Sequence, residues 1–268
     1  MTIELGLSYN TITLYVSAIR DWASDSGLED PLASHSFNQR RYKKFMRGVR
    51  RFCRARIRVR LPLKKREMVR VLKAIPNSGL EQKERTMLKA AILMAFYGLL
   101  RVSEYTFSAA KASTCLRRRD IRFIKSSDNA GFRVKLRLRC TKTSQFENST
   151  FVDIFPTNTQ LCPVQAIYDY YQLNHGMHSQ QPFLWSAGRP LSSARFNKLL
   201  RIALQNGGLN PKLYSSHSLR SGAATVAANK GVPEWVIQRL GRWKSQCFKI
   251  YIKSIKNNVR LAHKAMSF

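Results

Sequence analysis

The chain has 268 residues, enough for one full domain with a buried core and a smaller second domain. It carries 47 Lys and Arg against 15 Asp and Glu, a formal net charge of +32, while 44% of its residues are hydrophobic. This composition excludes a disordered tail, and the charge indicates a polyanionic partner rather than a small acidic metabolite.

The longest apolar stretch, residues 87–100, contains Lys89 and is shorter than the roughly 20 residues that cross a bilayer. The chain also lacks the opening pattern of a secretory signal, so we expect no membrane anchor and take nucleic acid as the leading partner. The five cysteines are odd in number and form no C-x-x-C pair. They predict neither a disulfide framework nor a zinc site, and they favour a reducing compartment.

The amino-terminal part is predicted to be a small helical domain. Residues 8–28 have apolar side chains at helical spacing and a stop at Gly27. Residues 40–66 contain 14 Lys or Arg and no carboxylate, first on a helical pattern and then in an alternating, extended one. Because a surface that is merely solvated mixes both signs, this run favours contact with DNA. We assign residues 1–55 to the helical domain and residues 56–66 to a basic linker.

Residues 67–268 are predicted to form a mainly α domain with a small antiparallel β-sheet, an α+β fold class. Alternating apolar and polar residues predict three antiparallel strands, near residues 120–124, 132–139 and 150–155. Helical periodicity predicts the remaining elements, near residues 64–75, 81–99, 163–173, 192–206, 216–230 and 233–240.

Separate positions along this domain carry residues suited to phosphate chemistry. Arg101 directly follows the most apolar helix, where an arginine needs a partner or a cleft. His217 and Arg220 are three residues apart on the first turn of a helix, and a helix amino terminus favours phosphate. Tyr251 lies in a basic segment and is either a core residue or a reactive one. A lone His-x-x-Arg pair is more often structural, so no single position decides the function.

Taken together, these residues resemble the tyrosine recombinases, the integrase family of DNA breaking and joining enzymes. The family's first catalytic arginine is matched by Arg101, the lysine of its β-hairpin by Lys142, and its nucleophile by Tyr251. Its His-x-x-Arg pair is matched by His217 and Arg220. The segments around residues 217–225 and 240–245 look most like the recombinases of eukaryotic mobile elements, the DIRS-like and Crypton elements.

The resemblance implies a role for each matched residue. Arg101 and Arg220 would hold the non-bridging oxygens of the phosphate, and Lys142 would protonate the departing 5′ oxygen. His217 would accept or shuttle the proton of the tyrosine.

One position of the family's pattern has two candidates in this chain. The family places a His or Trp about nine residues before the tyrosine, where this chain has Arg242, and Trp243 lies eight residues before it. We expect Trp243 to fill this position and keep Arg242 as the alternative.

The resemblance also implies an architecture and an activity. The fold would be a tyrosine recombinase catalytic core preceded by a partial, SAM-like core-DNA-binding domain that is shorter than the family's. The activity would be site-specific cleavage and rejoining of DNA through a 3′-phosphotyrosyl intermediate, serving mobile-element integration without a metal, ATP or another cofactor. The partners would be double-stranded DNA and further copies of the chain, as a dimer to tetramer on DNA, and a eukaryotic element would place the protein in the nucleus.

Two alternatives stay open at this point. A domesticated, non-catalytic DNA-binding protein would share the charge and the fold, although it has no reason to keep every catalytic residue type. A type IB topoisomerase would use the same chemistry as a monomer, and it would relax supercoils without a second DNA site.

Overall fold

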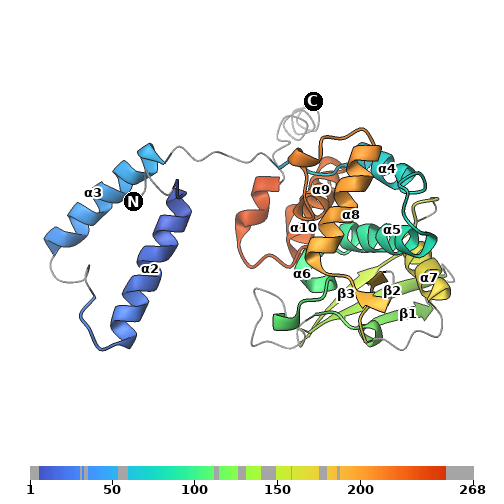
Figure 1. Cartoon of the computed structure of the whole chain (residues 1–268), viewed down its shortest axis with the longest axis horizontal. Helices are drawn as coiled ribbons and strands as arrows, with labels where there is room; N and C mark the ends of the chain where they lie inside the picture. Colours follow the sequence, from blue (N-terminus) through green and yellow to red (C-terminus); the bar gives the residue numbers. More distant parts are fainter. Residues whose placement is uncertain are drawn as a thin grey trace, which may run out of the picture. The chain divides into compact units, whose positions relative to one another are not determined.

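The computed structural model describes residues 6–30, 32, 36–53, 60–111, 115–125, 131–139, 149–157, 159–174, 180–185 and 188–251. The chain divides into two compact units, Met1–Val59 and Arg60–Phe268 (Figure 1). Residues 56–59 of the expected linker lie outside the described residues, whereas Arg60 belongs to the second unit. Its guanidinium donates to the backbone oxygens of Lys212 and Tyr214 at 2.8 and 3.0 Å.

The described residues of the first unit form two helices, α2 (Tyr9–Asp25) and α3 (Ser36–Phe52). Helix α2 begins where the hydroxyl of Ser8 accepts the backbone N–H of Thr11 at 3.2 Å, a typical amino-terminal cap. Several large apolar side chains of both helices, such as Trp22 and Phe45, are exposed to solvent.

The second unit is built around the buried helix α5 (Gln82–Tyr97), whose side chains from Met87 to Ala95 are nearly all inaccessible. This is the apolar stretch of the sequence, and it is buried because helices surround it. The described residues of this unit form the helices α4 (Lys65–Ala74), α5, α6 (Val102–Tyr105), α7 (Pro163–Leu173), α8 (Ser193–Asn206), α9 (His217–Asn229) and α10 (Glu234–Leu240). Short 3-10 turns are η1 (Ala109–Lys111), η2 (Arg118–Asp120), η4 (Pro211–Leu213) and η5 (Gln246–Tyr251).

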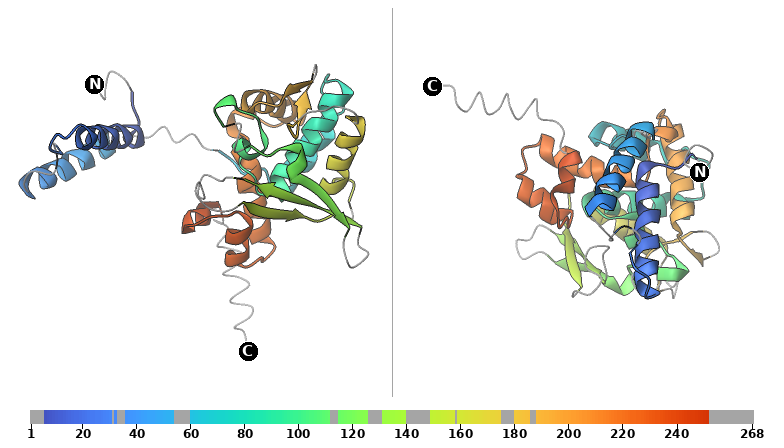
Figure 2. Two further views of the ribbon diagram at one scale, coloured as in Figure 1. Left: turned by 90° about the horizontal axis from the view of Figure 1, so that it is seen from below. Right: turned by 90° about the vertical axis from the view of Figure 1, so that its left-hand side faces the viewer.

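Three antiparallel strands form one sheet in the order β1 (Ile121–Lys125), β2 (Phe132–Leu138) and β3 (Thr150–Ile154). Figure 2 shows the strands lying at one side of the helices. One face of the sheet is apolar: Val134 and Leu136 are fully buried, and Phe123 packs edge-on against Tyr168 and Tyr171 of α7. The other face carries the intervening residues, which are mostly polar but include Ile124 and Phe151, as the period of two requires.

The predicted fold class is confirmed, because the described residues are mostly helical with a small three-stranded antiparallel sheet. The three predicted strands are present, and helix α7 has the predicted bounds. The sequence did not predict a two-residue hairpin, β4 (Leu184–Trp185) with β5 (Arg189–Pro190), because strands of this length show no periodicity. No helix in the described ranges is long and apolar enough to cross a membrane.

Candidate active site

The turn after helix α5 positions the first predicted site residue, Arg101. Helix α5 is capped at Gly98, and Leu99 then takes the left-handed conformation with φ 45°, which is uncommon for a residue other than glycine. Arg101 caps the next helix, α6, and Glu104 accepts its backbone N–H at 2.9 Å and its guanidinium Nη1 at 3.0 Å. The turn therefore fixes both the backbone and the side chain of Arg101.

Glu104 is the residue that joins this turn to the carboxyl-terminal part of the unit. Its side chain is only 4% exposed, and its Oε2 also accepts Nη2 of Arg242 at 3.0 Å. The backbone of Arg242 also takes the left-handed conformation, with φ 56°. Its guanidinium donates to the backbone oxygens of Gly98 and Leu99 at 3.1 Å each. One buried carboxylate thus holds two guanidinium groups, and losing it would leave buried positive charge.

Arg220, on helix α9, is the most deeply buried charged side chain of the site, at 1% exposure. Its guanidinium donates to the backbone oxygens of Leu99 and Gly241 and lies over the ring of Trp243, 4.5 Å from the ring centroid. Arginine suits this place because its planar fork makes two directed hydrogen bonds and stacks on an aromatic face.

Trp243 forms the apolar support of Arg220. It is 8% exposed and stacks on Phe248 of η5, with the ring centroids 5.7 Å apart. A side chain at Gly241 would meet the indole ring at 1.8 Å, so glycine is required where the backbone passes the ring. Trp243 therefore lies in the core beneath Arg220, while its neighbour Arg242 turns toward Glu104.

Helix α9 is held close to the start of the second unit. The backbone N–H of Leu63 donates to the backbone oxygen of Ser218 at 2.9 Å, and a Cβ at Gly222 would meet the Leu63 oxygen at 2.0 Å. The small residues at 222–224 thus permit this approach, as expected for a tightly packed face. The approach fixes the first turn of α9, which carries His217 and Arg220.

His217 keeps a solvent-accessible face on this first turn. Partial desolvation of the imidazole ring is the main cause that lowers the pKa of His217 below its ordinary value, and the positive charges of Arg220 and Arg101 lower this pKa further. The imidazole is therefore neutral at pH 7, the form that can accept a proton.

The structure brings four of the six predicted site residues together: Arg101, His217, Arg220 and Trp243. The backbone of Tyr251 ends η5, which packs on α9 and is anchored by Phe248, at 1% exposure. The side chain of Tyr251 and the whole of Lys142 lie outside the described residues.

Sequence reasoning did not select Glu104 as a site residue. A signal was present, since a Glu three residues after a helix-capping position is the pattern of a capping box. The Arg242 contact had no such signal, because its partner is 138 residues away in the chain.

The arrangement is suited to binding a phosphate. Glu104 pairs with Arg101 and Arg242, and the guanidinium of Arg220 bonds the Leu99 oxygen of the same turn, so positive charge exceeds negative charge. Backbone oxygens orient Arg220 and Arg242, and Glu104 orients Arg101, before any ligand binds. This is the preorganisation that stabilises developing charge on phosphate oxygens. Among the described residues no cluster of His, Cys, Asp and Glu could hold a metal ion.

Comparison with known proteins agrees with this geometry. The sequence pattern of the phage integrase family matches residues 62–257. No curated protein matches the chain in sequence.

Three solved structures illustrate the similarity of fold. The XerA recombinase is 17% identical, with a TM-score of 0.55 over 98% of this chain and 95% of that one. The Tn1549 transposon integrase, in complex with circular intermediate DNA, is 14% identical, with a TM-score of 0.56 over 93% and 76%. The XerH site-specific recombinase, bound to palindromic difH substrate after cleavage, is 15% identical, with a TM-score of 0.55 over 77% and 53%.

Proposed function

The chain belongs to the phage integrase family, and from this premise we propose that it is a site-specific DNA recombinase acting through a 3′-phosphotyrosyl intermediate. We further propose that it serves the integration of a mobile element of the DIRS-like or Crypton type and works in the nucleus of the host. The matched segment, residues 62–257, includes every predicted site residue, which supports a catalytic role over a purely structural one.

The observation that carries the proposal is the preorganised guanidinium pair. Arg220 bonds the Leu99 oxygen, and Arg101 lies two residues along the same turn, fixed by Glu104. In the proposed complex these two guanidinium groups contact the two non-bridging oxygens of one phosphodiester. Donors fixed in advance cost no reorganisation as negative charge grows on these oxygens.

In the proposed reaction, the hydroxyl oxygen of Tyr251 forms a bond to phosphorus and the bond from phosphorus to the 5′ oxygen breaks. The tyrosine proton passes to neutral His217, and Lys142 gives a proton to the departing 5′ oxygen. The new phosphotyrosine ester keeps the energy of the broken linkage, so a 5′ hydroxyl can reverse the step without ATP.

We assign Trp243 to the position where the family has His or Trp. Its indole supports the guanidinium of Arg220, and this contact favours it over Arg242. Arg242 is then a positioning residue, because it shares the Glu104 carboxylate with Arg101.

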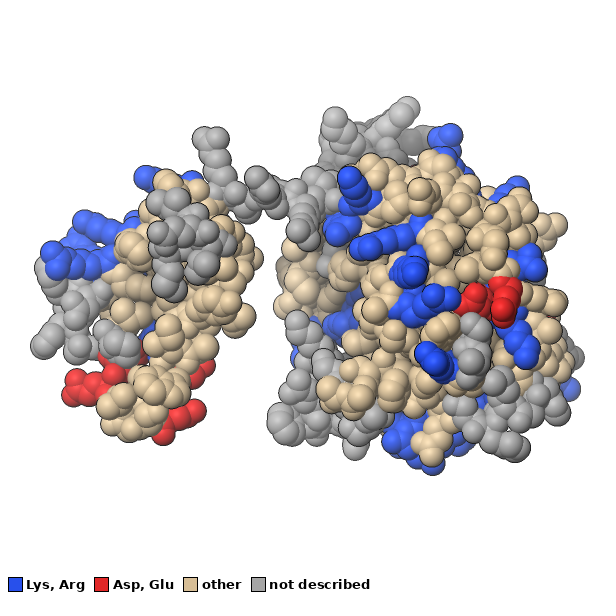
Figure 3. Space-filling model, viewed as in Figure 1, with Lys and Arg blue, Asp and Glu red and all other residues tan. Residues whose placement is uncertain are grey.

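Double-stranded DNA and further copies of the chain are the proposed partners. On the face of the second unit seen in Figure 3, Lys and Arg outnumber Asp and Glu. In the sequence, residues 189–268 contain 15 Lys or Arg, with Glu234 as the single acid. Such a surface neutralises phosphates, so duplex affinity should fall steeply with salt. We assign residues 1–55 to a core-DNA-binding domain. The linker predicted over residues 56–66 is limited to residues 56–59, because the second unit, which we assign as the catalytic domain, begins at Arg60.

The experiment that tests the proposal traps the covalent intermediate. Duplexes selected for binding from a randomised library are nicked next to the cleavage point, so that the cut end diffuses away and the adduct accumulates. The full chain should form a covalent adduct on the DNA 3′ phosphate with and without a chelator. Tyr251→Phe should form none while binding the duplex normally.

The matched control is Tyr168→Phe, which removes the hydroxyl of an exposed tyrosine on α7 and should leave the adduct unchanged. A selected duplex that is bound tightly yet never joined to the chain would favour the non-catalytic DNA-binding protein. Relaxation of supercoiled plasmid by a single chain, with no exchange between two sites, would favour the topoisomerase.

A further inference from the structure

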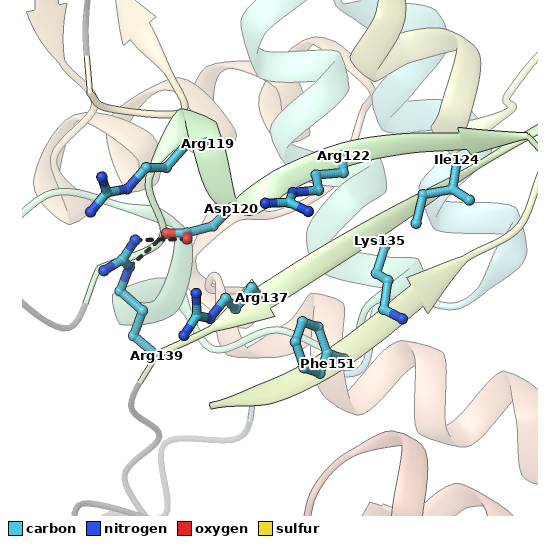
Figure 4. A pocket seen from close by; sticks show the side chains of 8 residues that line it. All are labelled: Arg119, Asp120, Arg122, Ile124, Lys135, Arg137, Arg139 and Phe151. Atoms are coloured by element: carbon cyan, nitrogen blue, oxygen red, sulfur yellow. Dashed lines mark hydrogen bonds and ion pairs between the residues drawn. The ribbon is translucent and has the colours of Figure 1, made fainter. Parts of the chain in front are cut away.

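The outer face of the β1–β2–β3 sheet is strongly basic. Along β2 the buried Val134 and Leu136 alternate with Lys135 and Arg137, so the cations share the face that turns away from the core. Lys135 pairs in register with Arg122 of β1, which is exposed. Figure 4 shows the side chains of Arg122, Lys135 and Arg137 on one side of the sheet, with Arg119 of η2 beside them.

Two described acids of this face, Asp120 and Asp153, already pair with other arginines. The carboxylate of Asp120 accepts two hydrogen bonds from Arg139, at 2.8 Å each, and Asp153 pairs with Arg133 at 3.4 Å. Four cations of this face, Arg119, Arg122, Lys135 and Arg137, each lack an ion pair with any carboxylate in the described part of the chain. Their charge is therefore available to an anion.

The same face is hollowed and contains an exposed aromatic ring. A cavity of about 650 Å³ is lined by these four cations together with Asp120, Ile124, Arg139 and Phe151. Phe151 of β3 lies opposite Arg137 in the sheet register and is 55% exposed. The ammonium of Lys135 is 4.9 Å from its ring centroid.

We propose that this outer face binds an unpaired DNA strand, with phosphates on Arg122, Lys135 and Arg137 and a base stacked on Phe151. A groove of cations that also presents an aromatic face is how sheets bind single strands without reading their sequence. A duplex keeps its bases stacked on one another and offers no base to Phe151, so the aromatic ring favours an unpaired strand. The choice of DNA over RNA rests on the proposed function.

A short segment of chain connects the candidate active site to this face. The backbone oxygen of Glu104 accepts the N–H of Leu116 at 3.0 Å, and η2, which carries Arg119, begins two residues later. A strand released near the active site would therefore find this surface close by.

The test measures affinity for a labelled oligo-dT of about 16 nucleotides, near the upper end of the site sizes of such surfaces. All chains carry Tyr251→Phe, so the result does not depend on cleavage and the two proposals can fail separately. Arg122→Gln with Arg137→Gln should weaken binding about tenfold or more at low salt. Loss of two phosphate contacts should also reduce the log–log salt slope by about 1.4 for a single strand.

The matched control is Lys73→Gln with Lys83→Gln, which removes the same charge from exposed positions on α4 and α5. It should change the affinity much less than the sheet variant does. Arg119→Gln, which alters η2 and leaves the strands intact, should act in the same direction as the sheet variant.

Phe151→Leu separates stacking from charge. It should weaken oligo-dT binding about fivefold or more, the lower end of what one stacked base contributes, with the salt slope unchanged. An abasic strand of the same length and a hairpin duplex should lose no affinity. The proposal is overturned if the sheet variant binds oligo-dT as the parent does, if the lysine control loses as much, or if Phe151→Leu weakens the abasic strand equally.

Discussion

The candidate active site and the outer sheet face are both basic, yet they hold their arginines in opposite ways. In the site, Arg220 is almost fully buried and its fork is bound to two backbone oxygens over an indole ring. On the sheet, Arg122 and Arg137 are exposed, and the acids nearby are paired with other arginines.

The difference shows what each region can do. A desolvated guanidinium with a fixed direction stabilises charge at one point, and it acts strongly because the local dielectric is low. An exposed guanidinium is screened by salt and can turn toward any phosphate that approaches. It therefore increases the affinity for nucleic acid but does not fix the position of a phosphate. The first arrangement suits a reaction, and the second suits the holding of a flexible chain.

The largest effect expected from breaking the buried arrangement is that of Glu104→Gln. The change removes the one negative charge shared by Arg101 and Arg242 and leaves both cations without it at a largely buried position. Breaking a buried pair costs about 3 to 5 kcal/mol, so the free energy of unfolding of the second unit should fall by that amount. Urea unfolding followed by tryptophan fluorescence measures it, and a loss below about 1 kcal/mol would mean that water reaches the pair.

The next largest effect concerns the rate of cleavage. Arg220→Ala should slow single-turnover cleavage of the nicked duplex by a factor of about 10² to 10³ at saturating DNA. Removal of one preorganised donor has an effect of this size in other enzymes. The control is Arg85→Ala, since Arg85 also donates to a backbone oxygen, that of Pro76 at 2.8 Å, but at the other end of α5. Equal rates for the two variants would contradict the special role of the buried arginine.

A smaller effect is expected in the pH dependence of cleavage. Desolvation and the charges of Arg220 and Arg101 disfavour protonated His217, so the imidazole stays neutral below its ordinary pKa of about 6.5. Activity that needs the neutral form should therefore be lost only as the pH falls below about 6.5. Arg101→Gln removes one of these charges, and the midpoint of its residual rate should move upward. A midpoint that stays in place would show that His217 is not the proton acceptor.

The sequence was sufficient to predict most of the regular elements of the second unit. The alternation along residues 132–138 predicted a half-buried strand, and the same alternation places Lys135 and Arg137 on one face. The stretch from Met87 to Ala95 predicted a buried helix because Lys89 is its only polar residue.

The geometry of the site was less accessible from the sequence. Leu99 and Arg242 adopt left-handed backbone conformations that their residue types do not predict. Local backbone hydrogen bonds close the ends of α5 and α10 around them, and tertiary contacts also hold them there. Those contacts join residues more than 100 positions apart, such as Arg220 with the Leu99 oxygen and Arg242 with Glu104. Local sequence patterns predicted Arg101, His217 and Arg220 as site residues, but they could not show that Trp243 lies beneath Arg220.

The smallest effect is expected on the sheet, for Asp153→Asn. The pair of Asp153 with Arg133 spans 3.4 Å and both side chains are about one-third exposed, 35% and 33%. Screening by water limits such a pair to about 1 kcal/mol or less, so the free energy of unfolding should barely change, in contrast to Glu104→Gln. The substitution also releases Arg133 and adds one net positive charge to the outer face, so oligo-dT affinity should rise at low salt and the gain should vanish at high salt. A destabilisation as large as that of Glu104→Gln would mean that the sheet face is organised like the active site, and the contrast between the two regions would fail.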